Sequence, residues 1–138
     1  MKKVMQDKFG FGGNCMSATM ATLFGLELHE VPSFWEGCDL EVGETPENGA
    51  IFHDNVNKFL KSQGHTSICL GANVPHVDWV TGISKGMPEA LLLVGGKSPR
   101  GYMHSVIWKN GILWHDPHPE GGGVVAQDIT FIVPLFEW

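Results

Sequence analysis

The stretch GGNCMSATMATLFG, residues 12–25, decides the fold. Asn14 is a residue type that favours the N-cap of a helix, and Gly25 is typical of the position where a helix ends. The pattern therefore predicts a helix with Cys15 in its first turn. A thiol there lies at the positive end of the helix dipole and close to unpaired amides, which favour the thiolate. Cys15 is thus a candidate nucleophile, and the alternative is an inert, half-buried cysteine at the start of an ordinary helix.

The predicted helix is apolar or small on nearly all sides. Its mildly polar positions are Ser17, Thr19 and Thr22, and it contains no charged residue. A helix without a charged face is normally surrounded by protein. We therefore expect this helix to be the central one, with Cys15 at the point where it emerges from the core.

The composition and charge of the chain narrow the classes of function. Its 138 residues, 43% hydrophobic and 17% charged, predict a single globular domain over residues 1–138. The net charge of -6 comes without any cluster of Lys or Arg, so nucleic acid is not an expected partner. No apolar run approaches the roughly 18 to 20 residues of a membrane span, and the N-terminus lacks the apolar core of a signal peptide. We expect a cytoplasmic protein with no membrane partner.

The three cysteines are Cys15, Cys38 and Cys69. Their odd number and irregular spacing argue against a disulfide framework and against a zinc ribbon, and fit a reducing cytoplasm. Cys69 lies in a short apolar strand pattern, so we expect it in the core. Cys38 lies in a predicted loop and is assigned no role.

The remainder of the chain predicts a second helix followed by strands. The helix runs from Pro46 or Asn48 to Gln63, and its apolar residues fall on one face at helical spacing. Residues 73–80 are ambiguous between a turn and a short helix over the sheet. Helices followed by strands predict an α+β fold with an antiparallel sheet. The predicted strands are 65–70, 89–94, 102–108, 112–115 and 129–136.

Residues 102–116 form a predicted hairpin with its turn at residues 109–111. Two registers are open for this hairpin. A turn of two residues sends His104 and Asp116 to opposite faces of the ribbon, whereas a loop of three residues with a G1 bulge places them directly opposite each other. We favour the three-residue loop because it places a carboxylate beside an imidazole.

In that register the hairpin supplies a base to the cysteine. His104 would take the proton from Cys15, and Asp116 would fix the tautomer of the imidazole and stabilise its protonated form. The thiolate would then attack an acyl carbon. The backbone amide of Cys15 and the side chain of Gln6 would hold the developing oxyanion.

Two further residues are candidates for contact with a substrate. Trp35 would line the groove. Arg100 lies shortly before His104 in the sequence and would meet a substrate carboxylate, the alternative being an ordinary solvated arginine.

Three segments carry a family resemblance: Gly13-Asn14-Cys15, His104-Ser105-Val106 and His115-Asp116-Pro117. They resemble papain-like cysteine peptidases, and most nearly the peptidase domains that cleave double-glycine leader peptides of bacteriocins and small proteins of that type from bacterial and phage genomes. The resemblance implies a papain-like fold, in which an N-terminal helix carrying the cysteine packs on a C-terminal antiparallel sheet. It also implies the order Cys15, His104, Asp116, with Gln6 as the oxyanion-hole glutamine, although Gln6 lies farther before the cysteine than in typical members.

The sequence thus predicts a cysteine-dependent hydrolase or acyltransferase that acts on a peptide, isopeptide or side-chain amide bond of a peptide or protein substrate. Peptide hydrolysis, deamidation and transglutaminase-like acyl transfer all use the same three groups, because the shape of the groove selects the acyl acceptor. No cofactor is expected.

Two other interpretations remain open. One is a zinc site formed by His115, Asp116 and His118 with His104 and Cys15. Neighbouring strand residues point in opposite directions, however, which disfavours convergence of these ligands, and no metal is expected. The other is a catalytically idle papain-like module. It would bind a partner protein through exposed aromatic residues such as Trp35, Trp79 or Trp138.

Overall fold

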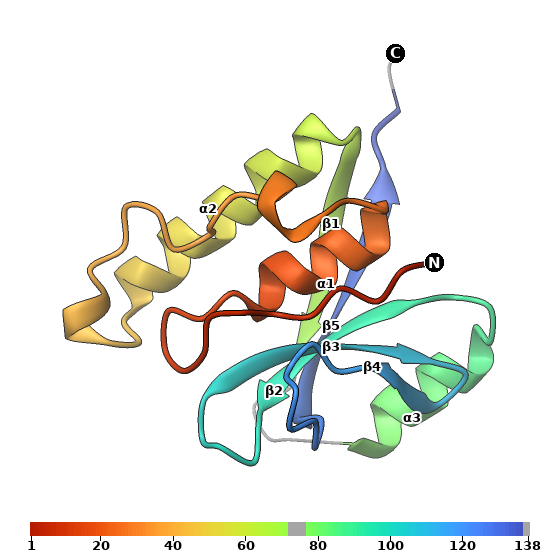
Figure 1. Cartoon of the computed structure of the whole chain (residues 1–138). Coiled ribbons are helices and arrows are strands. Elements are labelled where there is room, and N and C mark those ends of the chain that lie inside the picture. Colours follow the sequence, from red (N-terminus) through yellow and green to blue (C-terminus); the bar gives the residue numbers. More distant parts are fainter. Residues whose placement is uncertain (72–76, 137–138) are drawn as a thin grey trace.

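The computed structural model describes residues 1–71 and 77–136. In this part of the chain, five strands form one antiparallel sheet in the order β1-β5-β2-β3-β4 (Figure 1). The α+β fold with an antiparallel sheet is therefore confirmed. The helices are α1 Cys15–Phe24, α2 Pro46–Ser62 and α3 Val77–Gly86, with 3-10 turns η1 Leu28–Glu30 and η2 Leu40–Val42. The strands are β1 His65–Gly71, β2 Leu92–Lys97, β3 Met103–Lys109, β4 Ile112–His115 and β5 Val125–Pro134.

Helix α1 begins at the predicted cysteine. Residues 17–22 are all buried, which confirms the expectation of a central helix. Gly25 ends the helix in the left-handed conformation with φ 68°, a region that glycine enters without steric cost. Asn14 occupies the N-cap position, but its side chain makes no capping hydrogen bond.

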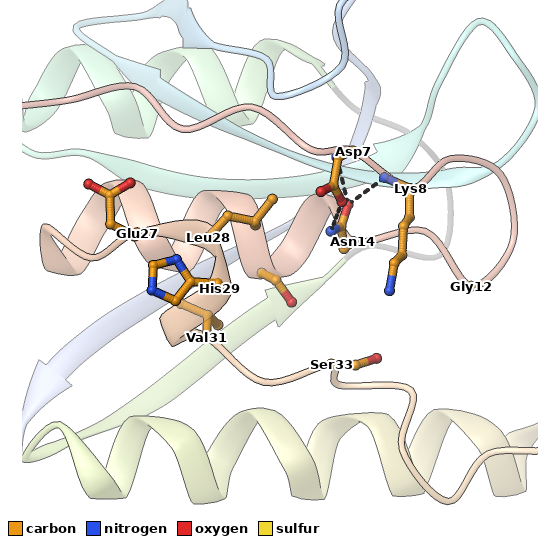
Figure 2. Close-up of a pocket in the computed structure, with 10 residues that line it drawn as sticks. Asp7, Lys8, Gly12, Asn14, Glu27, Leu28, His29, Val31 and Ser33 are labelled. Carbon is orange, nitrogen blue, oxygen red and sulfur yellow. Dashed lines mark hydrogen bonds between the residues drawn. The ribbon is translucent and has the colours of Figure 1, made fainter.

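Asn14 instead fastens the segment that leads to the helix. Its Oδ1 accepts from the backbone N–H groups of Asp7 and Lys8, and its Nδ2 donates to the Asp7 carboxylate at 2.7 Å (Figure 2). These bonds close the glycine-rich loop before α1 on itself. The conformation of the loop is therefore tied to the start of the helix.

The two faces of the sheet are covered by different helices. Leu93 of β2 belongs to a buried cluster with residues of α1 and α2, including Met20 and Leu60. Val94, the next residue, belongs to a second cluster with Val80 of α3. Because successive strand residues point to opposite faces, α1 and α2 lie on one face and α3 on the other (Figure 1).

Two predicted strands differ from the structure by several residues at their ends, and the other three agree to within one residue. The strand expected at residues 89–94 is β2, which starts at Leu92 and continues through Gly95 and Gly96. Pairing with β3 on one side and β5 on the other overrides the low strand propensity of the glycines. The strand expected at 129–136 is β5, Val125–Pro134. In the ambiguous segment, helix α3 begins at residue 77, and residues 72–76 lie outside the described part of the chain.

The expectation that Cys69 lies in the core is wrong. Cys69 is exposed, and 54% of the neighbouring Ile68 is exposed as well. The reason is the position of β1 at the edge of the sheet, where it pairs only with β5 and has fewer neighbours to cover its side chains.

The predicted three-residue loop of the β3–β4 hairpin is also wrong. Asn110 and Gly111 form a two-residue turn, with φ of 49° and 79°, and Trp108 pairs with Leu113. Positive φ at both central positions matches the twist of the flanking strands, which is why this dipeptide favours the short turn.

A short turn alone would place His104 and Asp116 on opposite faces of the ribbon, but a bulge in the same hairpin changes this. The register shifts between Trp108, which pairs with Leu113, and Ile107, which pairs with His115, so that β4 contains one extra residue. One extra residue reverses the alternation of side chains beyond it. Asp116 therefore returns to the face of the ribbon that carries His104.

Among the described residues, no helix combines the length and the apolar composition needed to cross a membrane.

Two glycines of the fold are predicted to respond in opposite ways to a Cβ. In the described structure nothing lies within 4 Å of a Cβ built on Gly82, in the interior of α3, so Gly82→Ala should stabilise the protein by about 1 kcal/mol through helix propensity. A Cβ on Gly96 would overlap with the carbonyl oxygen of Val125, so Gly96→Ala should destabilise by roughly 3 kcal/mol. Chemical denaturation measures both, and equal effects of the two substitutions would contradict the packing described.

Candidate active site

The residues singled out in the sequence meet at a cavity of about 310 Å³. Cys15 at the start of α1, His104 of β3 and the ring of Trp35 line it together with one side of α2 and the face of the sheet. Cys15 is half-buried, and α1 packs against β3. The first and last thirds of the chain therefore contribute jointly to one site.

His104 and Asp116 form a buried hydrogen-bonded pair. Nε2 of His104 lies 2.7 Å from Oδ1 of Asp116, and each side chain is only 5% exposed. The Asp116 carboxylate also accepts from the backbone N–H groups of His118 at 2.9 Å and Gly123 at 2.8 Å. With Nε2 engaged by Asp116, Nδ1 is the ring nitrogen left for Cys15.

The protonation of this pair differs from that of isolated side chains. Burial alone lowers the pKa of His104, but the hydrogen bond with Asp116 and the interaction with Cys15 outweigh it and raise the pKa to about 9. Burial likewise raises the pKa of Asp116, but His104 and the N–H groups of His118 and Gly123 lower it to about 2. The pair is thus an imidazolium and a carboxylate at neutral pH.

Gln6 links the two sides of the site from outside the cavity. Its backbone N–H donates to the carbonyl of Pro117, the residue after Asp116, at 3.0 Å. Its Nε2 donates at 2.9 Å to the carbonyl of Lys8, which also accepts from the N–H of Asn14. Gln6 is not among the described residues that line the cavity, although its buried amide lies beside the residue that precedes Cys15.

Arg100 does not enter the cavity, contrary to the expectation that it meets a substrate there. Its guanidinium donates to the carbonyl of Gly121 at 2.9 Å. The prediction was based on the nearness of Arg100 to His104 in the sequence. It is wrong because the turn before β3 directs the arginine toward the loop after Asp116. The role visible in the structure is to hold this loop, whose Gly123 binds Asp116.

The interpretation as a zinc site is not supported by the positions of its ligands. Nε2 of the buried His115 lies 2.7 Å from the carbonyl of Val4, and Nδ1 of His118 accepts from the N–H of Glu120. In residues 1–71 and 77–136, no three His, Cys, Asp or Glu side chains converge as metal ligands.

The aromatic residues proposed for an idle binding module are less exposed than that interpretation assumes. Trp35 and Trp79 are both half-buried. Nε1 of Trp35 donates to the carbonyl of Gly13 at 2.8 Å, and Nε1 of Trp79 is buried. Trp138 lies outside the described residues.

Sequence reasoning missed several residues that line the cavity. They are Cys69 of β1, Asp128 and Thr130 of β5, and His53 of α2. Asp128 carried a signal, because it is the only charged residue of its strand. His53 carried none, since it lies on the exposed and polar side of its helix.

A second cavity, of about 430 Å³, lies on the other side of the loop before α1, beside Glu27 and His29 (Figure 2). Neither Cys15 nor His104 lines it. The candidate catalytic residues Cys15 and His104 therefore line the smaller of these two cavities.

Comparison of the chain with family models, with curated proteins and with solved structures found no match. The functional inference therefore depends on the geometry of Cys15, His104 and Asp116 and on the cavity around them.

Replacement of the buried carboxylate is predicted to change the protonation of His104. In Asp116→Asn the pKa of His104 should fall below about 9, because the hydrogen bond that most favours the imidazolium is weakened and the negative charge is removed, while the interaction with Cys15 remains. Histidine NMR titrations of both proteins measure this change. The matched control is Asp54→Asn on the exposed side of α2, in which the pKa of His104 should stay at about 9.

The same pair should make stability depend on pH. The raised pKa of His104 contributes to the free energy of unfolding. This contribution is complete below pH 6.5 and is lost as pH rises through about 9. The lowered pKa of Asp116 also contributes to the free energy of unfolding. That contribution is complete above pH 3.8 and is lost as pH falls through about 2. The difference in unfolding free energy between wild type and Asp116→Asn should therefore be greatest from about pH 4 to 6.5. A difference that stays constant up to pH 10 or so would contradict the pairing.

Proposed function

We propose that this protein is a papain-like cysteine hydrolase or acyltransferase that acts on an amide bond of a peptide or protein substrate. Cys15 is the nucleophile, His104 the general base and acid, and Asp116 the group that orients the imidazole. The observation that carries the proposal is the 2.7 Å contact of His104 with Asp116 at the wall of the cavity that Cys15 also lines.

The start of α1 supports a role in binding negative charge. The first N–H groups of a helix have no partner within the helix, and a side chain at the N-cap usually satisfies one of them. Here the Asn14 side chain is bonded to Asp7 and Lys8 instead, so it leaves the amides of the first turn uncapped. Uncapped amides beside Cys15 are suitable donors to a thiolate or to an oxyanion.

In the proposed reaction, the Cys15 proton already resides on His104 as an imidazolium, and the thiolate sulfur of Cys15 attacks the acyl carbon of the substrate. The N–H of Cys15 donates to the oxyanion. The candidate second donor is the other hydrogen of the Gln6 Nε2 group, whose first hydrogen is bonded to the Lys8 carbonyl. His104 then gives its proton to the departing amine, which leaves a thioester on Cys15. Water or a second amine attacks the thioester, His104 accepts the proton of this acceptor, and the Cys15 sulfur is released.

An aromatic wall beside the cysteine suits a peptide side chain. The Trp35 ring packs against Phe11, with centroids 4.9 Å apart, and against Phe52 at 4.6 Å. All three rings line the cavity, and the Trp35 hydrogen bond to Gly13 holds its indole in place. A rigid apolar wall with few polar groups is typical of sites that bind ligands.

Selective alkylation tests the reactivity of Cys15. With iodoacetamide at neutral pH, Cys15 should be modified at least about tenfold faster than Cys38 and Cys69, since the imidazolium favours the thiolate and desolvation raises the pKa of Cys69. His104→Ala should remove the advantage, whereas the surface variant His29→Ala should retain it. Peptide mapping by mass spectrometry gives the three rates. Equal rates for Cys15 and Cys69 in the wild type would refute the proposal.

Trapping with hydroxylamine tests the acyl intermediate. When the protein is incubated with a mixed peptide pool and hydroxylamine, attack of hydroxylamine on a Cys15 thioester should release peptide hydroxamates. Mass spectrometry should detect these products with the wild type and not with Cys15→Ser, while Cys38→Ser should behave as the wild type. Hydroxamates formed equally by Cys15→Ser would exclude Cys15 as the nucleophile.

A further inference from the structure

Asp128 lies in the middle of the sheet and lines the cavity that contains Cys15 and His104. Its partners on the two neighbouring strands are both glycines, Gly71 of β1 and Gly95 of β2. Acidic residues and glycines are both unfavourable in the interior of a sheet, where side chains pack against their cross-strand neighbours. A row of three such residues opens the surface of the sheet around one carboxylate.

Gly95 is required for the position of this carboxylate. A Cβ on Gly95 would lie 2.5 Å from Oδ1 of Asp128, which is too close for two atoms that are not bonded. A Cβ on Gly71 would lie 3.8 Å from the Cβ of Asp128, an ordinary contact. The close approach is therefore specific to the β2 side, toward β3 and His104.

The charge of the cavity favours a cation. In the described part of the chain no lysine or arginine lines it, and its acids are Asp128 and the exposed Glu44. The positive charge of His104, which also lines it, is paired with Asp116. Burial raises the pKa of Asp128, and the Gly95 N–H and His53 of α2 offset this increase only in part. A partly buried carboxylate without a lysine or arginine gains most from a cationic ligand.

The sheet register places this carboxylate near the proposed reaction centre. Asp128 pairs with Gly95, and Gly95 pairs with Ser105, the residue after His104. Neighbouring strands are about 4.8 Å apart, so roughly 10 Å separates the backbone of Asp128 from that of Ser105. An extended peptide advances about 3.4 Å per residue, so this separation corresponds to the side chain of a residue close to the attacked carbonyl.

We propose that Asp128 binds a basic side chain of the substrate, Lys or Arg, one or two residues before the acyl group that Cys15 attacks. The proposal rests on the proposed function of the site. Gly95 positions the carboxylate, and the apolar wall with Trp35 would contact the aliphatic part of the basic side chain. Asp128 is thus a specificity-determining residue.

Peptidyl chloromethyl ketones test this preference, because the Cys15 sulfur displaces chloride and becomes labelled. The probes are Ac-Ala-Ala-Ala chloromethyl ketones in which the first or second alanine is replaced by Lys, norleucine or Glu. At one of these positions we expect the Lys probe to label Cys15 at least about tenfold faster than the norleucine probe, and the Glu probe to be slowest. Peptide mapping separates labelling of Cys15 from labelling of Cys69.

Asp128→Asn should reduce the ratio of Lys to norleucine rates to about one, since it removes the charge and retains an acceptor for the Gly95 N–H. The matched control is Asp54→Asn on the exposed side of α2, which should keep the wild-type ratio. Gly95→Ala should also lower the ratio by displacing a carboxylate that keeps its charge. Thermal melting shows whether each variant is folded. If Asp128→Asn does not fold, Gly95→Ala provides the test.

The outcomes separate the two proposals. A wild-type ratio near one at both positions, with iodoacetamide labelling of Cys15 still dependent on His104, would overturn the role of Asp128 and leave the proposed function intact. Loss of the preference in Glu44→Gln, but not in the Asp128 or Gly95 variants, would assign the cation to the other acid and also overturn it. Absence of selective labelling of Cys15 by any reagent would refute the proposed function itself.

Discussion

The hydrogen bond between His104 and Asp116 is the interaction on which the rest of the site depends. It holds only because several backbone groups converge on the carboxylate: the N–H groups of His118 and Gly123 bind it, and Arg100 holds the intervening loop through the Gly121 carbonyl. The carboxylate is thus fixed by the loop that follows it as much as by the imidazole. Because the Asp116 carboxylate is fixed and binds Nε2 of His104, the imidazole ring is held in one orientation, with Nδ1 left for Cys15.

The N-terminal segment connects this pair to the start of α1, where Cys15 lies. Gln6 donates from its backbone to Pro117 and from its side chain to Lys8, while Asn14 binds the backbone of the same segment. Residues on either side of the cavity are therefore joined by a short series of hydrogen bonds outside it. This series gives the segment before α1 a structural purpose that is independent of any direct role of Gln6 in binding an oxyanion.

The sequence predicted the features that depend on local chemistry. The end of α1 at Gly25 and its burial follow from the glycine and from the lack of a charged face. Its start was also predicted, although Asn14 makes no capping hydrogen bond there. The contact of His104 with Asp116 was also predicted, but for the wrong reason, because a bulge in β4 and not the loop length brings them together. Whether a bulge forms depends on the relative stability of alternative strand registers over the whole hairpin. The spacing of apolar residues does not reveal this relative stability.

The errors on single residues share a physical origin. Cys69 was assigned to the core because strand periodicity does not reveal which strand ends at the edge of the sheet. Arg100 was assigned to the groove because nearness in sequence does not determine the direction of a side chain. Asp128 was overlooked because its importance depends on the two glycines that face it across strands from distant parts of the chain.

The extra residue in β4 has a consequence for how homologous chains can vary. Substitution of Trp114 changes one side chain, but deletion of any single position between the turn and Asp116 would invert the orientation of everything that follows and turn the carboxylate away from the imidazole. Evolution is therefore expected to tolerate changes of residue type in this strand far more readily than changes of its length. In relatives that keep the pairing of His104 with Asp116, indels should accumulate elsewhere, with the spacing from Asn110 to Asp116 preserved.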